Sequence, residues 1–220
     1  MYRFAAFDLD GTLLDTLEGI GLAANAALGE LGFPQWPISE YRTATGYGPF
    51  RLAQALLPKE VGDNTEIIDN FLLRYKTNYY RDCLQATQPF SGIVSALKEL
   101  RERNMKLAVL SNKPHEFIEP LINRFFPGIF DFASGFREGT EPKPAPDELN
   151  ALIKQFGVSA EQSAYVGDMI IDLETATNAG CRPVGVLWGF SGEVLKAYDG
   201  EGTVLVETAD EMKRVLLQEA

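Results

Sequence analysis

Histidine is almost absent from this 220-residue sequence, in which His115 is the single example. That scarcity excludes most catalytic schemes built on a Ser/His or Cys/His pair and most histidine-based metal centres. Cysteine is nearly as rare, and Cys83 and Cys181 stand far apart, without the close spacing of metal-binding pairs. We therefore expect two reduced thiols, as is usual in a cytoplasmic protein.

Positive charge and long hydrophobic runs are lacking as well. The 20 lysine and arginine residues face 31 aspartate and glutamate residues, and the resulting net charge of −11 argues against nucleic acid or an anionic membrane surface as a partner. No apolar run approaches the length of a transmembrane helix, and the N-terminal residues do not resemble a signal peptide. We expect a cytoplasmic monomer or homodimer, and a small anionic substrate would need a local concentration of positive charge.

What the sequence does contain is a regular alternation of two patterns. Short apolar runs typical of buried parallel strands occupy residues 3–8, 106–110, 131–134, 163–167 and 182–187, with a weaker run at 203–206. Helical patterns occupy residues 91–103, 114–125, 146–156, 170–179 and 209–218. The alternation predicts an α/β fold with a doubly wound, mainly parallel sheet of the Rossmann-like kind, covered by helices on both faces.

Residues 17–86 interrupt this alternation, because they contain no convincing strand. Their pattern predicts helices at residues 17–31, 38–45, 49–57 and 60–81, punctuated by prolines. We therefore predict an inserted helical domain at 17–86, between the two parts of an α/β core at 1–16 and 87–220.

Two carboxylates, Asp8 and Asp10, follow the first apolar run directly, before Gly11 and Thr12 turn the chain. Residues two apart in a strand point to the same side, so these two anions would face one another. Such a pair is tolerable when a cation lies between the carboxylates or when one carries a proton. The alternative interpretation is a solvated strand-to-turn junction, where aspartate is favoured in any case.

Further polar residues stand where other predicted strands end, which is where open α/β sheets bind ligands. Ser111 and Asn112 follow the second strand, Lys143 lies between prolines, and Asp168 precedes Asp172 by one helical turn. Together they supply carboxylates, a hydroxyl and an ammonium group, which suits a phosphoryl group and a divalent metal. Taken singly, each has a plainer explanation, such as a helix N-cap, a solvated lysine or acids that complement a helix dipole.

The order and spacing of these motifs resemble the haloacid dehalogenase-like hydrolase superfamily. The matching strings are Asp8-Leu-Asp10-Gly-Thr, Ser111-Asn112, Lys143 and Gly167-Asp168-Met-Ile-Ile-Asp172. The helical insertion resembles the type 1 cap of that superfamily. Shorter strings at residues 42–48, 111–114 and 141–146 are similar to its phosphoglycolate phosphatase branch.

The resemblance implies a phosphatase that works through an aspartyl-phosphate intermediate. Asp8 would be the nucleophile, and Asp10 would protonate the leaving alcohol and then deprotonate the attacking water. Ser111, the main-chain amide of Asn112 and the ammonium of Lys143 would bind the phosphate.

The same resemblance implies Mg²⁺ as the cofactor. Asp8, Asp168 and the main-chain carbonyl of Asp10 would hold the ion, whereas Asp172 would orient a metal-bound water or Lys143 from outside the ligand set. The cap would close over the site and exclude water, with 15–16 and 87–89 as hinges.

Departures from other branches narrow the reaction to phosphate hydrolysis. Dehalogenases of the superfamily lack the second aspartate and phosphonate-cleaving members carry alanine there, whereas this chain has Asp10. Hexose phosphate mutases carry a cap histidine soon after the first motif and an arginine after a cap glycine. Here residues 18–20 read Glu-Gly-Ile, and Pro49 stands near the position of that arginine.

The leaving group remains open at this stage. The preferred interpretation is a small phosphate monoester such as phosphoglycolate, and the alternatives are pyrophosphate, a sugar phosphate or a nucleotide. Arg42 and Arg51 are candidates for binding a substrate carboxylate, although either one could equally be a solvated residue on a helix face. A non-catalytic phosphate-binding protein is the alternative from another class, and its signature would be the loss of Asp8, Asp10 or Lys143.

Overall fold

A single parallel sheet organises the chain. The computed structural model describes residues 2–82 and 84–218, so Cys83 lies outside the described residues, whereas Cys181 is a buried, free thiol. Within those ranges, no helix is both long and apolar enough to cross a membrane. The six-stranded sheet has the order β5-β4-β1-β6-β7-β8, and each neighbouring pair is parallel. The strands are β1 (Phe4–Phe7), β4 (Lys106–Pro114), β5 (Phe132–Phe136), β6 (Ser163–Gly167), β7 (Arg182–Val186) and β8 (Val204–Val206).

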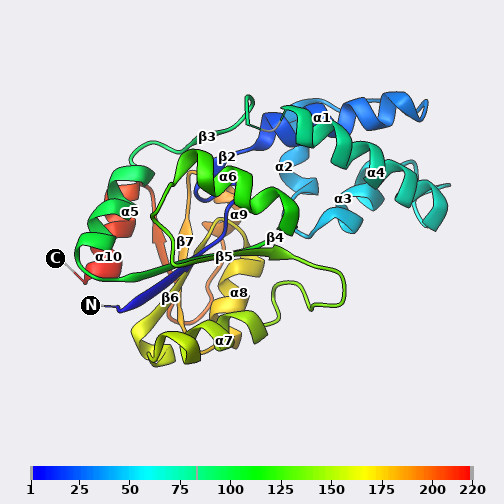
Figure 1. Cartoon of the computed structure of the whole chain (residues 1–220). Coiled ribbons are helices and arrows are strands. Elements are labelled where there is room, and N and C mark those ends of the chain that lie inside the picture. Colours follow the sequence, from blue (N-terminus) through cyan, green and yellow to red (C-terminus); the bar gives the residue numbers. More distant parts are fainter. Residues whose placement is uncertain (1, 83, 219–220) are drawn as a thin grey trace.

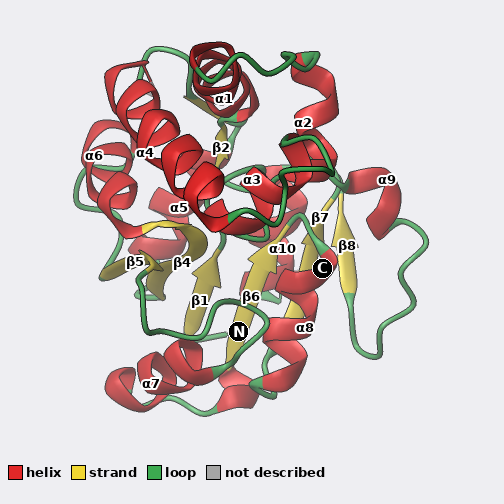
Figure 2. Ribbon diagram, turned by 90° about the vertical axis from the view of Figure 1, so that its right-hand side faces the viewer, coloured by secondary structure: helices red, strands yellow, loops and turns green. Residues whose placement is uncertain are grey.

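Helices cover both faces of this sheet, which confirms the predicted doubly wound α/β fold (Figures 1 and 2). Side chains alternate along β1: Ala5 and Phe7 join one apolar cluster, whereas Phe4 and Ala6 join another. The first cluster is closed by α5 (Ile93–Glu102), α6 (Ile118–Phe125) and α10 (Ala209–Leu217). The second is closed by α7 (Asp147–Phe156) and α8 (Ile170–Asn178).

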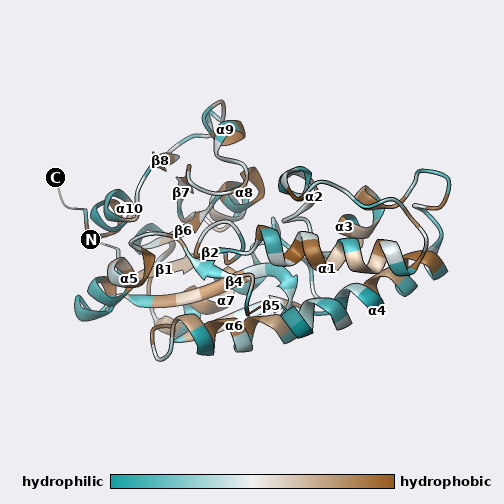
Figure 3. Ribbon diagram, turned by 90° about the horizontal axis from the view of Figure 1, so that it is seen from above, coloured by the Kyte–Doolittle hydropathy of each residue, from teal (hydrophilic) through white to brown (hydrophobic). Residues whose placement is uncertain are grey.

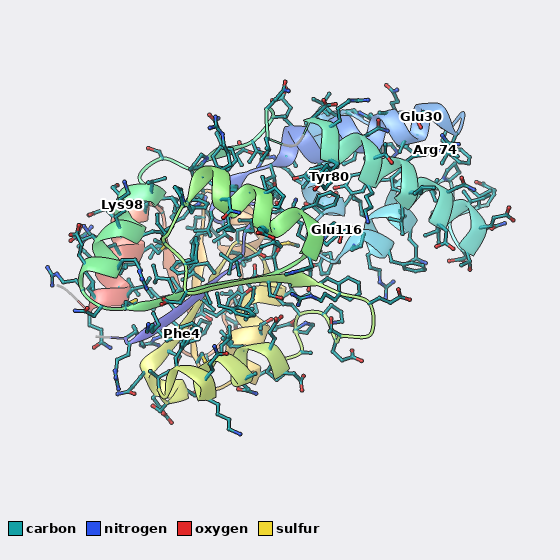
Figure 4. All side chains as sticks on the ribbon, in the orientation of Figure 1. Phe4, Glu30, Arg74, Tyr80, Lys98 and Glu116 are labelled. Atoms are coloured by element: carbon teal, nitrogen blue, oxygen red, sulfur yellow. The ribbon has the colours of Figure 1, made fainter. Side chains whose placement is uncertain are left out.

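A helical segment lies beyond the carboxyl ends of the strands (Figure 2). It consists of α1 (Leu17–Glu30), a 3₁₀ turn (Ile38–Glu40), α2 (Tyr41–Ala44), α3 (Pro49–Leu56) and α4 (Thr65–Asp82). Hydrophobic residues along α1 and α4 form its own core, and Figure 3 shows these two long helices side by side. At the far end of the segment, Arg74 pairs with Glu30 at 2.9 Å (Figure 4).

The structure differs from the sequence-based prediction in local details. Helix α4 begins at Thr65 and not at residue 60, because the Asn64 side chain accepts hydrogen bonds from the N–H groups of Glu66 and Ile67 and so caps the helix there. Strand β4 runs on to Pro114, so the helix predicted from residue 114 starts later, with a 3₁₀ turn ahead of α6. Helix α9 (Gly192–Leu195) was not predicted.

Two further strands, each of two residues, were also not predicted. Strand β2 (Leu14–Asp15) pairs antiparallel with β3 (Gln88–Pro89). They form a ribbon where the chain leaves the sheet for the helical segment and where it returns.

Candidate active site

The loop that follows β1 is folded tightly on itself and aims its two aspartates in different directions. The N–H groups of Leu13 and Leu14 both bond to the carbonyl of Leu9. Gly11 adopts a positive φ of 83°, and a Cβ atom there would lie 2.4 Å from a carboxylate oxygen of Asp168. Glycine is therefore required at this position for two reasons, backbone conformation and the close approach of a carboxylate.

Three carboxylates converge beside this loop. One oxygen from each of Asp8, Asp168 and Asp172 can be chosen so that all lie within 4.8 Å of one another, and all three residues are buried. Asp168 is held at both oxygens, by the Thr12 hydroxyl at 3.0 Å and by the Phe190 N–H at 2.7 Å. Burial raises the pKa of the Asp168 carboxyl well above its usual range, and the neighbouring carboxylates of Asp172 and Asp8 raise it further.

Lys143 brings a positive charge into this cluster. Its Nζ lies 2.6 Å from Asp172 Oδ1 and 2.8 Å from Asp8 Oδ1. Burial alone lowers the pKa of the ammonium, but the carboxylates of Asp172 and Asp8 outweigh that effect and hold the pKa well above its usual value. Burial likewise raises the pKa of the Asp172 carboxyl, against the opposing effect of Lys143. Lys143 is therefore charged, and it balances one of the three carboxylates.

The donor set fits a divalent metal ion. Asp8 Oδ1 lies at ion-pair distance from Lys143, yet it is buried and accepts no hydrogen bond from any described residue. Carboxylate oxygens are the ligands that hard divalent cations prefer, and a cation would relieve the repulsion that raises the pKa of Asp168. Asp172, expected to stay outside the ligand set, lies within the cluster, whereas the side chain of Asp10 does not belong to it.

Asp10 has separate partners. Lys113 Nζ lies 2.9 Å from each of its carboxylate oxygens, and the Thr16 hydroxyl donates to Oδ1 at 2.8 Å. The Lys113 ammonium is buried, and the ring of Tyr79 from α4 lies 4.4 Å from it. Two aspartates one residue apart in the sequence are thus balanced by two different lysines, Asp8 by Lys143 and Asp10 by Lys113.

Ser111 and Asn112 also reach the site, but Asn112 does more than the sequence suggested. Its side-chain oxygen accepts the N–H of Lys143 at 2.9 Å, and its Nδ2 donates to the Gly46 carbonyl in the helical segment at 3.1 Å. Ser111 Oγ accepts the N–H of Lys113 at 3.3 Å. The Asn112 side chain therefore connects the Lys143 loop to the helical segment.

These groups surround a small cavity of about 40 Å³ between the sheet and the helical segment. The sheet side is polar, and the helical side supplies mainly apolar groups. The lining residues are Asp8, Asp10, Ser111, Asn112, Lys113 and Pro114 from the sheet side, and Ile20, Thr45, Gly46, Gly48, Pro49, Leu52 and Tyr75 from the helical side. Neither arginine proposed from the sequence is among them: Arg51 is exposed, and Arg42 reaches the carbonyl of Gly189 at 3.5 Å.

Comparison with known proteins agrees with this geometry. The sequence pattern that defines the family described as haloacid dehalogenase-like hydrolases matches residues 5–186. The chain belongs to this family. The matched residues include every motif at the site and the whole helical segment. The similarity to the family is therefore not limited to the short motifs and covers most of this hydrolase.

Relatives of this hydrolase carry a more specific name. A phosphoglycolate phosphatase from Pseudomonas putida is 30% identical over 193 residues, which cover 86% of this chain and 71% of the relative. A phosphoglycolate phosphatase from Aquifex aeolicus is 30% identical and covers 86% of each chain. Among solved structures, a protein from Lactobacillus delbrueckii subsp. bulgaricus, named by prediction as a phosphoglycolate phosphatase, matches with a TM-score of 0.89 at 33% identity, over 98% of both chains.

Proposed function

We propose that this hydrolase is a Mg²⁺-dependent phosphatase that acts on a small phosphate monoester, with phosphoglycolate as the preferred substrate. The observation that carries the proposal is the separate placement of two neighbouring aspartates. Asp8 lies in the acidic cluster beside Lys143, and Asp10 lies outside it, paired with Lys113. Phosphoryl transfer through an aspartyl-phosphate needs such a division between a nucleophile and an acid–base group. The names of the relatives support the choice of substrate.

In this proposal Asp8 attacks phosphorus, and the leaving alcohol takes a proton from Asp10. Water then attacks the phosphorus of the aspartyl-phosphate and gives a proton to Asp10. The bond between Asp8 and phosphorus breaks, which releases orthophosphate and restores the carboxylate of Asp8 and the protonated carboxyl of Asp10. The environment of Asp8 Oδ1 supports its role, because this buried oxygen accepts no hydrogen bond from the described residues and has only the Lys143 ammonium beside it, at 2.8 Å. Asp10 is held in place by Lys113 and Thr16, as an acid–base group must be.

The phosphate would lie against Ser111, the main-chain amide of Asn112 and Lys143. Mg²⁺, held by Asp8, Asp168 and the main-chain carbonyl of Asp10, would neutralise phosphate charge when bound. Residues 17–86 form the cap in this proposal, over a core of 1–16 and 87–220, and exclude water from the cavity. The net charge of −11 and the small cavity support a small-molecule partner and no nucleic acid, and in this proposal the protein is cytoplasmic.

A turnover screen over a panel of phosphate esters tests the function. With Mg²⁺ present, we expect phosphoglycolate to give a higher kcat/KM than sugar phosphates, nucleotide monophosphates or pyrophosphate. Highest turnover with another ester would keep the mechanism and change the substrate. Release of phosphate from no ester would support a phosphate-binding protein, against which the presence of Asp8, Asp10 and Lys143 already argues.

Metal removal should affect both activity and stability. Exhaustive chelation is expected to abolish turnover, and Ca²⁺ should restore less of it than Mg²⁺, because calcium takes more ligands in a looser geometry. Adding Mg²⁺ to the chelated protein should raise the melting temperature, since the ion binds only the folded carboxylate cluster. In Asp168→Asn both responses should be much weaker. Full activity after chelation would contradict the metal site.

A further inference from the structure

The cavity contains a polar group for which the proposed chemistry has no use. Thr45, at the end of α2, is 4% exposed, and its hydroxyl has no hydrogen-bond partner among the described residues. It lines the same cavity as Asp10 and Lys113. Burying a hydroxyl without a partner is unfavourable, so a hydroxyl at a ligand cavity is best explained by a ligand atom that completes its bonding.

The position of Thr45 is fixed by contacts that hold its neighbour against the sheet domain. Gly46 has a φ of 94°, and a Cβ atom there would lie 2.0 Å from Met169 Sδ. The Gly46 carbonyl accepts a hydrogen bond from Asn112, and the Thr45 N–H bonds to the carbonyl of Tyr41 at 3.1 Å. Hydrogen bonds therefore fix the backbone both at Thr45 and at the residue that follows it, and this fixes the position of the Thr45 hydroxyl.

Lys113 is the cation that lines this cavity. No other lysine, arginine or histidine is among the described residues around it. Because its ammonium lies 2.9 Å from both oxygens of Asp10, it stands beside the group that would protonate the leaving alcohol. Lys143, in contrast, lies at the acidic cluster with Asp8 and Asp172. Lys143 thus lies on the side of the site where the phosphate would bind, and Lys113 lies on the side of the leaving group.

We propose that Thr45 and Lys113 form a subsite that binds a carboxylate on the leaving group of the substrate. This inference rests on the proposed phosphatase function and names the feature by which the enzyme selects its substrate. An anionic leaving group would be repelled by Asp8 and Asp10, and the Lys113 ammonium offsets that repulsion. The Thr45 hydroxyl and the Lys113 ammonium each donate to a carboxylate oxygen. The volume of about 40 Å³ limits the leaving group to a few atoms.

A neutral ester of similar size separates this subsite from the rest of the site. Phosphoglycolate and ethyl phosphate share the two-carbon ester, but only the former carries a carboxylate. In Thr45→Val, which keeps the volume and removes the hydroxyl, we expect kcat/KM to fall about 10-fold or more for phosphoglycolate and less than about 3-fold for ethyl phosphate, as the loss of a hydrogen bond to a charged group predicts. Thr45→Ser should restore most of the preference.

Thr43→Val is the matched control. Thr43 lies on the same short helix, is exposed, and donates its hydroxyl to the carbonyl of Glu40, away from the cavity. In this variant, kcat/KM should be unchanged for both esters. If Thr45→Val lowers kcat/KM equally for the two esters, or for neither of them, the subsite proposal is wrong.

Binding to a variant that cannot turn over gives a second measurement, independent of the rate. In Asp8→Asn with Mg²⁺, calorimetry should show tighter binding of phosphoglycolate than of ethyl phosphate, and adding Thr45→Val or Lys113→Met should remove that difference. The subsite proposal is wrong if phosphoglycolate still binds more tightly than ethyl phosphate after each of the two substitutions. It is also wrong if Asp8→Asn alone binds the two esters equally. The phosphatase function fails separately, when the wild-type protein releases phosphate from no ester.

Discussion

Asp8→Asn is expected to abolish turnover while the protein remains folded. The amide has almost the same shape as the carboxylate, and Asp8 is 4% exposed, so packing changes little. An amide cannot act as the nucleophile, and we expect activity to fall by roughly 10³-fold or more, as for other lost nucleophiles. Removing one of three clustered carboxylates also reduces their repulsion, so the melting temperature of the metal-free protein should be unchanged or higher.

The measurement is phosphate release from phosphoglycolate, together with a thermal melt. Asp69→Asn is the matched control, because Asp69 is exposed on α4, and it should keep full activity. Mass spectrometry must first exclude conversion of the new asparagine back to aspartate. A pure variant that retains more than a few per cent of wild-type activity would rule out Asp8 as the nucleophile.

Lys143→Met should damage stability as well as turnover. The methionine fills much of the same space but leaves Asp8 and Asp172 without their shared cation. Removing one partner of a buried ion pair typically costs about 3–5 kcal/mol, because the remaining charge stays buried and uncompensated. We expect a loss of that order in the free energy of unfolding of the metal-free protein, smaller with Mg²⁺ present. Turnover should fall by about 10²-fold or more, since the phosphate loses a fixed positive charge.

Chemical denaturation with and without Mg²⁺ measures this effect. Lys76→Met is the control: Lys76 pairs with Glu116 at 2.7 Å on the surface, where Figure 4 shows Glu116 near the junction of sheet and helical segment. Exposed pairs contribute about 0–1 kcal/mol. Similar losses of stability in the two variants would mean that Lys143 has no special electrostatic role in the cluster.

The sequence predicted the sheet and most of the acidic site because those features depend on local patterns. Buried parallel strands are short apolar runs, and ligand groups follow them directly, as Asp8 and Asp168 do. Their convergence then requires only that the strands lie side by side. Strands β1 and β6 are adjacent in the sheet, so these two carboxylates meet.

The remaining contacts depend on how distant segments meet, which local patterns do not encode. Lys113 belongs to the string at 111–114 that resembles the family, but nothing in that string indicates that its ammonium pairs with Asp10, 103 positions away. The Phe190 N–H that holds Asp168 is a backbone group, which any residue would supply. The chemistry of arginine made Arg42 and Arg51 candidates for binding a carboxylate, but the cavity is lined by Thr45 and Lys113 and by neither arginine.

A ribbon of two paired strands bends more readily than it shears, because sliding would break its hydrogen-bond register. In β2 and β3, Leu14 stands opposite Pro89 and Asp15 opposite Gln88. The segment that leads from the sheet to the helices is therefore paired with the segment that leads back. The two chain connections between the helices and the sheet are therefore coupled to each other and not independent. If the helices open and close over the site, as we propose, the paired strands would guide that movement as one joint and would return Thr45 to the same position above Asp10.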